Sequence, residues 1–258
     1  MMRLFHFVSL LAIACLIPFS NANGIGQDHA NTLMKLAEEN YAEGNYTEAL
    51  AIYDSLNVEY SGTTLLYNIG NCHFKLGDVP RAILFFERAL RLAPGDEDVL
   101  SNLRLAREQI VDRVNAPEAF SLGSAWSRFR AGGDPDQWAR YALWSVLAIF
   151  VCLACALYFK QRMLRRLLFA LSTVAVITSI IVISFASYRY LEIDDNSQAI
   201  ILTPKVDVRS EPREGSTVLF VLHKGTKVDI LQETNSWFEV SLPNGTVGWM
   251  PPATLERI

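Results

Sequence analysis

The chain has 258 residues, 51% of them hydrophobic, and its 23 basic and 27 acidic residues leave a net charge of −4. A mildly acidic chain of this kind offers no basic stripe to neutralise phosphates, so the composition argues against nucleic-acid binding. The length would suit one or two ordinary domains, but two long apolar runs divide the chain and leave two smaller segments to fold beside them.

Residues 1–22 have the organisation of a secretory signal peptide. Arg3 supplies positive charge, residues 7–17 are apolar, and Ser20-Asn21-Ala22 is a small-x-small cleavage site. We therefore expect this segment to be removed during export. An uncleaved anchor helix is the alternative.

Residues 28–115 contain a helical repeat. Gly44 and Gly77 lie 77 − 44 = 33 residues apart, and the same offset pairs Tyr53 with Phe86. A period near ~34 residues, with small positions facing aromatic ones, predicts helix hairpins stacked as a solenoid. Each glycine is expected to end the first helix of its hairpin, where a left-handed residue is needed. A third helix, from Asp96 to about residue 114, is predicted to be a terminal cap without a partner helix.

The repeat resembles the tetratricopeptide repeat family. The residues that carry the likeness are Tyr67-Asn68-Ile69-Gly70-Asn71, Phe74-Lys75-Leu76-Gly77-Asp78, Ala82, Phe86, Ala89-Leu90 and Pro94. The resemblance implies an all-α helical repeat with a protein-binding concave face, for which the candidate residues are Met34, Glu38, Tyr41, Tyr67, Asn71 and Lys75. Arrays usually need at least ~3 repeats for stability. We therefore expect this short module to gain stability from a partner, the linker or the membrane surface.

Two charge-free apolar runs, residues 141–159 and 167–188, have about the ~20 residues that a membrane-spanning helix needs. The basic loop between them, residues 160–166, is predicted to be cytoplasmic because Lys and Arg in short loops stay inside. Both flanking segments are then extracytoplasmic. Residues 116–140 are rich in aromatic residues and are predicted to form an interfacial linker, with a plain linker as the alternative.

The membrane runs contain no charged residue of the kind that marks transport or proton relay. Cys152 and Cys155 form a C-x-x-C, but a thiolate would be costly inside an apolar helix. We therefore favour helix packing over redox chemistry for this pair.

Residues 197–258 predict a small all-β barrel. Asn244-Gly245 is a strong hairpin signal because both residues tolerate positive φ. The predicted strands are residues 199–202, 206–208, 218–222, 227–231, 237–241 and 246–250.

The stretch from Val206 to Pro212, with residues 225–228, 237–240 and 245–250, resembles bacterial SH3 domains. That likeness implies peptidoglycan peptides as a ligand class. Trp237 and Trp249 are the candidate groove residues, although a role in the barrel core is favoured because large aromatics dominate small cores.

The order of signal, tetratricopeptide repeats, two membrane helices and bacterial SH3 domain resembles the BatE family of aerotolerance operons, most closely over residues 82–94 and 219–228. The resemblance implies a two-pass, multi-domain protein of the bacterial inner membrane that acts as a scaffold in oxidative-stress tolerance. It also implies von Willebrand A-type membrane proteins and a MoxR-type ATPase as partners. A wall-binding receptor is the alternative. No catalytic, cofactor or metal site is expected, because His29, His73 and His223 lack metal-ligand spacing.

Overall fold

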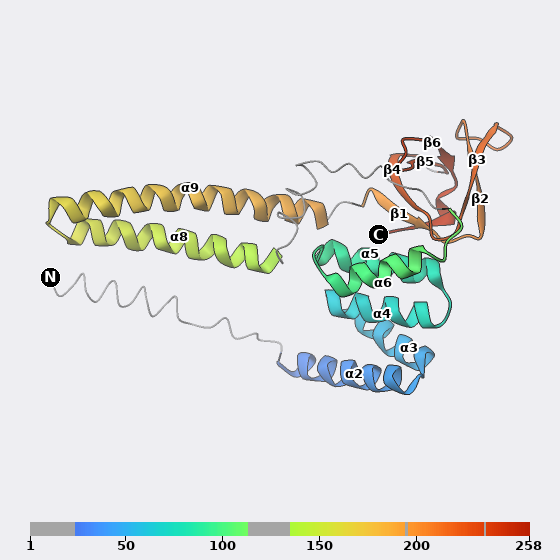
Figure 1. Ribbon diagram of the computed structural model, residues 1–258, viewed down its shortest axis with the longest axis horizontal. Coiled ribbons are helices and arrows are strands. Elements are labelled where there is room, and N and C mark those ends of the chain that lie inside the picture. Colours follow the sequence, from blue (N-terminus) through green and yellow to red (C-terminus); the bar gives the residue numbers. More distant parts are fainter. Residues whose placement is uncertain (1–23, 113–134, 194–195, 235) are drawn as a thin grey trace. The chain divides into compact units, whose positions relative to one another are not determined.

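The computed structural model describes residues 24–112, 135–193, 196–234 and 236–258 (Figure 1). The predicted signal peptide and all but the last residues of the predicted linker lie outside this part of the chain. The chain divides into two compact units, Met1–Leu56 and Asn57–Ile258, and each is described by itself.

The first unit contains α2 (Gly24–Glu43) and most of α3 (Tyr46–Asn57). Gly44 separates the two helices with φ +87°, and its N–H donates to the Tyr41 carbonyl at 3.1 Å. The left-handed turn expected at this glycine is confirmed. In α3 the buried side chains Ala49 and Tyr53 are one turn apart, as an amphipathic helix requires.

The second unit begins with α4 (Thr63–Lys75), α5 (Val79–Leu92) and α6 (Glu97–Arg107). Gly77, with φ +81°, follows α4, the first helix of the α4–α5 hairpin, as predicted. Side-chain caps start the next two helices: Asp78 accepts from the Arg81 N–H, and Asp96 accepts from the N–H groups of Asp98 and Val99 at 3.1 Å. Helix α6 is shorter than predicted.

Close packing between α4 and α5 explains the small and aromatic residues of the repeat. Gly70 of α4 faces the buried ring of Phe86, and a Cβ at Gly70 would lie 2.6 Å from Phe86 Cε1. Ala82 of α5 is completely buried. The repeat residues therefore set how closely the two helices approach each other.

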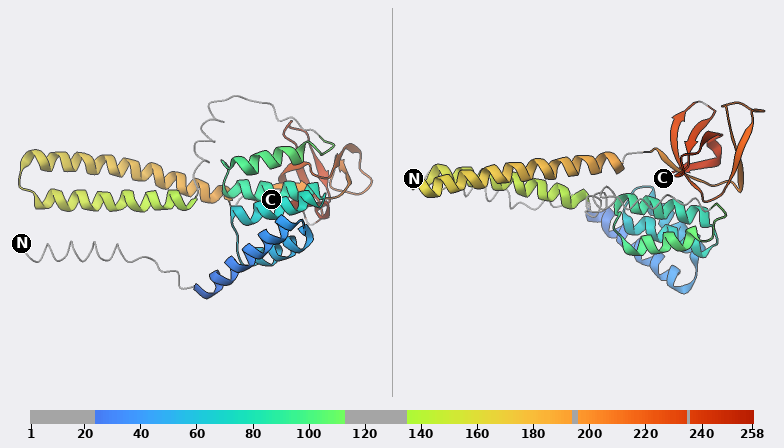
Figure 2. Two further views of the ribbon diagram at one scale, coloured as in Figure 1. Left: turned by 60° about the horizontal axis from the view of Figure 1, so that its bottom comes forward. Right: turned by 45° about the horizontal axis from the view of Figure 1, so that its top comes forward.

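Two apolar helices follow, α8 (Pro135–Tyr158) and α9 (Arg162–Ile193), which run side by side as a hairpin (Figures 1 and 2). Both are long and apolar enough to cross a membrane. The small side chains of Ala156, Ser172 and Ser179 are buried, and small residues allow two helices to approach closely. Helix α9 starts at Arg162, so the connection is shorter than the predicted loop, because Arg, Met and Leu are good helix formers.

The rest of the second unit is a curled antiparallel sheet (Figure 2). Its strands are β1 (Gln198–Ile201), β2 (Lys205–Arg209), β3 (Val218–His223), β4 (Lys227–Glu233), β5 (Phe238–Ser241), β6 (Val247–Met250) and β7 (Leu255–Arg257). Their order in the sheet is β3-β2-β6-β5-β4-β1-β7. The first six match the predicted strands within one or two residues. Strand β7, which follows a short 3-10 turn (Pro252–Thr254) and pairs with β1, was not predicted.

The core of this barrel consists of Ala199, Ile201, Val206, Val208, Leu222, Val228, Ile230, Val240, Leu242 and Met250. Phe220, Phe238 and Leu255 pack against it. Gly245 has φ +84°, so the Asn-Gly turn between β5 and β6 forms as expected.

Candidate interaction surfaces

Three polar side chains join α4 to α6 on the face predicted to bind proteins. Asn102 of α6 donates from Nδ2 to the Tyr67 hydroxyl at 2.9 Å and to the Asn71 Oδ1 at 2.8 Å. Tyr67 also packs against Phe86, with ring centroids 6.0 Å apart. The network holds both candidates in fixed positions at the junction of the helices. Lys75, one further turn along α4, is exposed.

The other three repeat candidates lie on α2 in the first unit. Met34, Glu38 and Tyr41 are spaced i, i+4 and i+7, so they share one helix face. Glu38 is exposed, and Met34 and Tyr41 are half-buried. The Tyr41 ring meets Tyr46 edge to face at a centroid distance of 5.1 Å, which restrains it beside the turn.

Trp237 and Trp249 do not belong to the core of the barrel, where we expected them to lie. Both are half-buried and lie outside the core cluster, because their neighbours Phe238 and Met250 take the inward positions and pair with each other across β5 and β6. Successive residues of a strand face opposite sides, so Trp249 of β6 is directed away from the core, whereas Trp237 lies just before the first residue of β5.

Trp237 helps to line a hollow of about 590 Å³ together with Pro212, Thr234 and Ser236. The Thr234 N–H donates to the Trp237 carbonyl at 2.9 Å, and the Thr234 hydroxyl accepts from the Trp237 N–H at 3.1 Å. These bonds fix the backbone that carries the indole. The hollow offers one flat aromatic surface beside hydroxyl groups, which suits a ligand with both apolar and polar parts.

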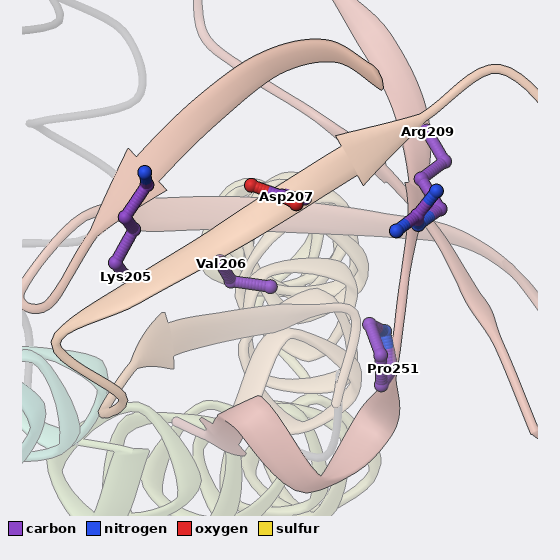
Figure 3. A pocket seen from close by; sticks show the side chains of 5 residues that line it. All are labelled: Lys205, Val206, Asp207, Arg209 and Pro251. Atoms are coloured by element: carbon purple, nitrogen blue, oxygen red, sulfur yellow. The ribbon is translucent and has the colours of Figure 1, made fainter. Parts of the chain in front are cut away.

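A second hollow of about 410 Å³ follows β2 and is closed on one side by Pro251 (Figure 3). Lys205, Asp207 and Arg209 alternate along the strand, while Val206 between them belongs to the core. Because acidic and basic groups share the rim, this hollow selects no single sign of charge.

Sequence reasoning missed a buried ionic cluster between α5, α6 and the barrel. The Glu87 side chain is only 8% exposed, yet it forms two ion pairs. One partner is Arg107 of α6, and the other is Lys227 of β4, whose Nζ lies 2.9 Å from Glu87 Oε2. Opposite charges on both sides offset the desolvation of this carboxylate.

Asp112 makes a second contact of the same kind. Its carboxylate accepts from the His223 N–H at 2.6 Å and from the Thr226 hydroxyl at 2.9 Å, and the His223 Nδ1 lies 2.9 Å from Oδ1. Burial raises the pKa of Asp112, but the hydrogen bonds from His223 and Thr226 outweigh it and hold the pKa below its ordinary value. The ionised form therefore stabilises this contact.

Comparison with known families agrees with this architecture. Residues 64–96 match the tetratricopeptide repeat, and residues 204–256 match the bacterial SH3 domain. The chain therefore contains two modules of classes that serve protein interaction, one before and one after the apolar helical hairpin in the sequence. Among the residues that the structure describes, no group of three or more His, Cys, Asp or Glu side chains could hold a metal ion.

Proposed function

We propose that this protein is a non-enzymatic scaffold of a bacterial inner-membrane complex that resembles the aerotolerance system. In this proposal α8 and α9 cross the membrane, and both interaction modules are extracytoplasmic. Lys160 in the connection and Arg162, Arg165 and Arg166 at the start of α9 are basic, which favours a cytoplasmic position for this end of the hairpin.

The observation that carries the proposal is a contact between the module that precedes the hairpin in the sequence and the module that follows it. Glu87 precedes the two apolar helices and Lys227 follows them, yet their side chains form an ion pair. Two segments in contact must lie on the same side of a membrane, and two crossings satisfy that condition.

The partners proposed from the family resemblance are von Willebrand A-type membrane proteins and the MoxR-type ATPase system. We propose that the concave repeat face holds the former through Tyr67 and Asn71. Truncating an aromatic anchor at an interface commonly costs about 2 kcal/mol or more. The double variant Tyr67→Ala, Asn71→Ala should therefore reduce co-purification of von Willebrand A-type proteins from native membranes.

Two matched variants separate binding from folding in this experiment. Tyr67→Phe keeps the ring against Phe86 and removes only the hydroxyl, and Thr64→Ala changes an exposed residue of the same helix. Both should retain the partner better than the double variant. Wild-type recovery by the double variant, with normal helical circular dichroism, would contradict the assignment of this face.

The hollow beside Trp237 supports the alternative of a wall-binding receptor. That function predicts that Trp237→Ala abolishes sedimentation of the protein with purified peptidoglycan while membrane partners are retained. A scaffold that does not bind the wall predicts no sedimentation by either form.

A further inference from the structure

Strand β1 is buried on both of its faces. Ala199 and Ile201 belong to the barrel core, whereas Ile200, between them, lies outside that core and is still 0% exposed. Alternate residues of a strand face opposite sides, so something outside the barrel covers Ile200. Helix α5 of the repeat region contacts β1.

An apolar contact continues this surface at the turn after β3. Gly225, with φ +91°, is buried, and a Cβ there would lie 2.5 Å from Cγ2 of Ile110 and 3.4 Å from Cδ1 of Ile83. Only glycine provides both the left-handed backbone and the space for this close approach. The turn is therefore shaped to receive the helices as well as to reverse the chain.

Polar groups surround the apolar centre. Arg88 of α5 donates from Nη2 to Glu256 Oε1 at 2.9 Å and to the Arg257 carbonyl at 2.5 Å. Arg91, one turn further, donates to the Ile258 carbonyl at 2.6 Å. Together with the Glu87 and Asp112 contacts, these bonds form a polar rim around an apolar core, which is the organisation of specific protein interfaces.

We propose that the barrel caps the tetratricopeptide array and that its partner surface is the α5–α6 face of the same chain. A complete third repeat would cover α5 and α6 with a second helix. The barrel, through β1, β4, β7 and the turn after β3, covers part of this surface instead. The repeat region thereby gains the stabilisation that two repeats and a cap helix lack, and the two modules act as one body.

This inference rests on the proposed function only in placing both modules on one side of the membrane. If α5 covers the β1–β7 face of the barrel, other proteins must bind to other surfaces. A ligand of the β1–β7 face would have to displace α5, whereas the Tyr67–Asn71 face and the hollow beside Trp237 do not take part in the contact.

Cysteine crosslinking in the full-length protein tests the contact directly. Val111 and Lys224 are exposed and lie between the touching pairs Ile110–Gly225 and Asp112–His223. With the native cysteines replaced by alanine, Val111→Cys and Lys224→Cys should be joined within one chain by a short bismaleimide in intact spheroplasts.

Charge reversal gives the matched controls. Lys227→Glu places a second carboxylate against the buried Glu87 and should slow crosslinking about tenfold or more. Lys227→Met, which leaves Glu87 paired with Arg107, should slow it less. Arg88→Glu and Glu256→Arg should each slow it about fivefold, and the double reversal should restore most of the rate. Recovery in the double variant excludes a simple failure to fold.

Two results would overturn the inference. The first is that a monofunctional maleimide labels both cysteines but the bismaleimide does not join them. The second is that none of the charge-reversal variants changes the rate of crosslinking. Labelling of both cysteines by an impermeant reagent would then leave the proposed topology standing, whereas protection of one of them would refute the topology itself.

Discussion

Gly70 offers a sharp test of the repeat packing. An ideal Cβ at this position would lie 2.6 Å from Cε1 and 2.7 Å from Cδ1 of Phe86. Carbon atoms prefer a separation of about 3.5–4.0 Å. Phe86 is fully buried and packs against Tyr67, so its ring has little room to move. Gly70→Ala therefore forces a displacement within the hairpin of α4 and α5.

Two opposing effects set the magnitude. Alanine is favoured over glycine inside a helix by about 0.5–1 kcal/mol, whereas overpacking costs about 1–3 kcal/mol. We expect a net loss of about 1–2 kcal/mol, which corresponds to a factor of about 5–30 in the local opening equilibrium.

Hydrogen exchange by mass spectrometry, on the full-length protein in nanodiscs, measures this opening in peptides from α5. Protection there should fall by that factor in Gly70→Ala. Adding Phe86→Leu should make the double variant less destabilised than the sum of the single changes, because the smaller side chain relieves the overlap. Unchanged or increased protection in Gly70→Ala would refute the close-approach argument.

Further predictions concern other parts of the chain. Ala82→Trp should overpack a fully buried site, cost about 1–3 kcal/mol or more, and lower the helical circular dichroism. Ser172→Leu should loosen the α8–α9 hairpin, seen as altered mobility in detergent gels, because Ser172 is buried. Gly245→Val should destabilise the barrel by about 1–2 kcal/mol in urea unfolding, because φ is +84° there. The pKa of Asp112 is lowered, so its contact with His223 is fully formed at pH values above 3.8, the ordinary pKa of an aspartate. The contact is lost as the pH falls through the lowered pKa of Asp112. Crosslinking of the interface cysteines should therefore weaken on acidification, and Asp112→Asn should remove that part of the pH dependence.

Features set by local chemistry were predictable from the sequence. Gly44 and Gly77 mark helix ends because the left-handed region favours glycine, and the Asn244-Gly245 turn follows from the same preference. The apolar runs of α8 and α9 were also visible, because their length alone suits a membrane-spanning helix.

Features set by contacts distant in sequence were not predictable in the same way. Strand β7 has only three residues, and its identity depends on pairing with β1. The outward direction of Trp249 depends on its neighbour Met250 entering the core. One signal was present: Ala199-Ile200-Ile201 is a continuous apolar run in an antiparallel sheet, where one solvated face would give alternation. That run indicates burial on both faces, and the docking surface could have been inferred from it.

In the topology that we propose, the two interaction modules lie on the same, outer side of the membrane and are joined through a two-pass hairpin. Single cysteines at Ser61, Gln161 and Asn244, all exposed positions, test it with a membrane-impermeant maleimide in a cysteine-free background. Ser61→Cys and Asn244→Cys should react in intact spheroplasts, and Gln161→Cys should react only after permeabilisation. Labelling of Gln161→Cys in intact spheroplasts, or a difference in accessibility between the other two cysteines, would contradict this topology.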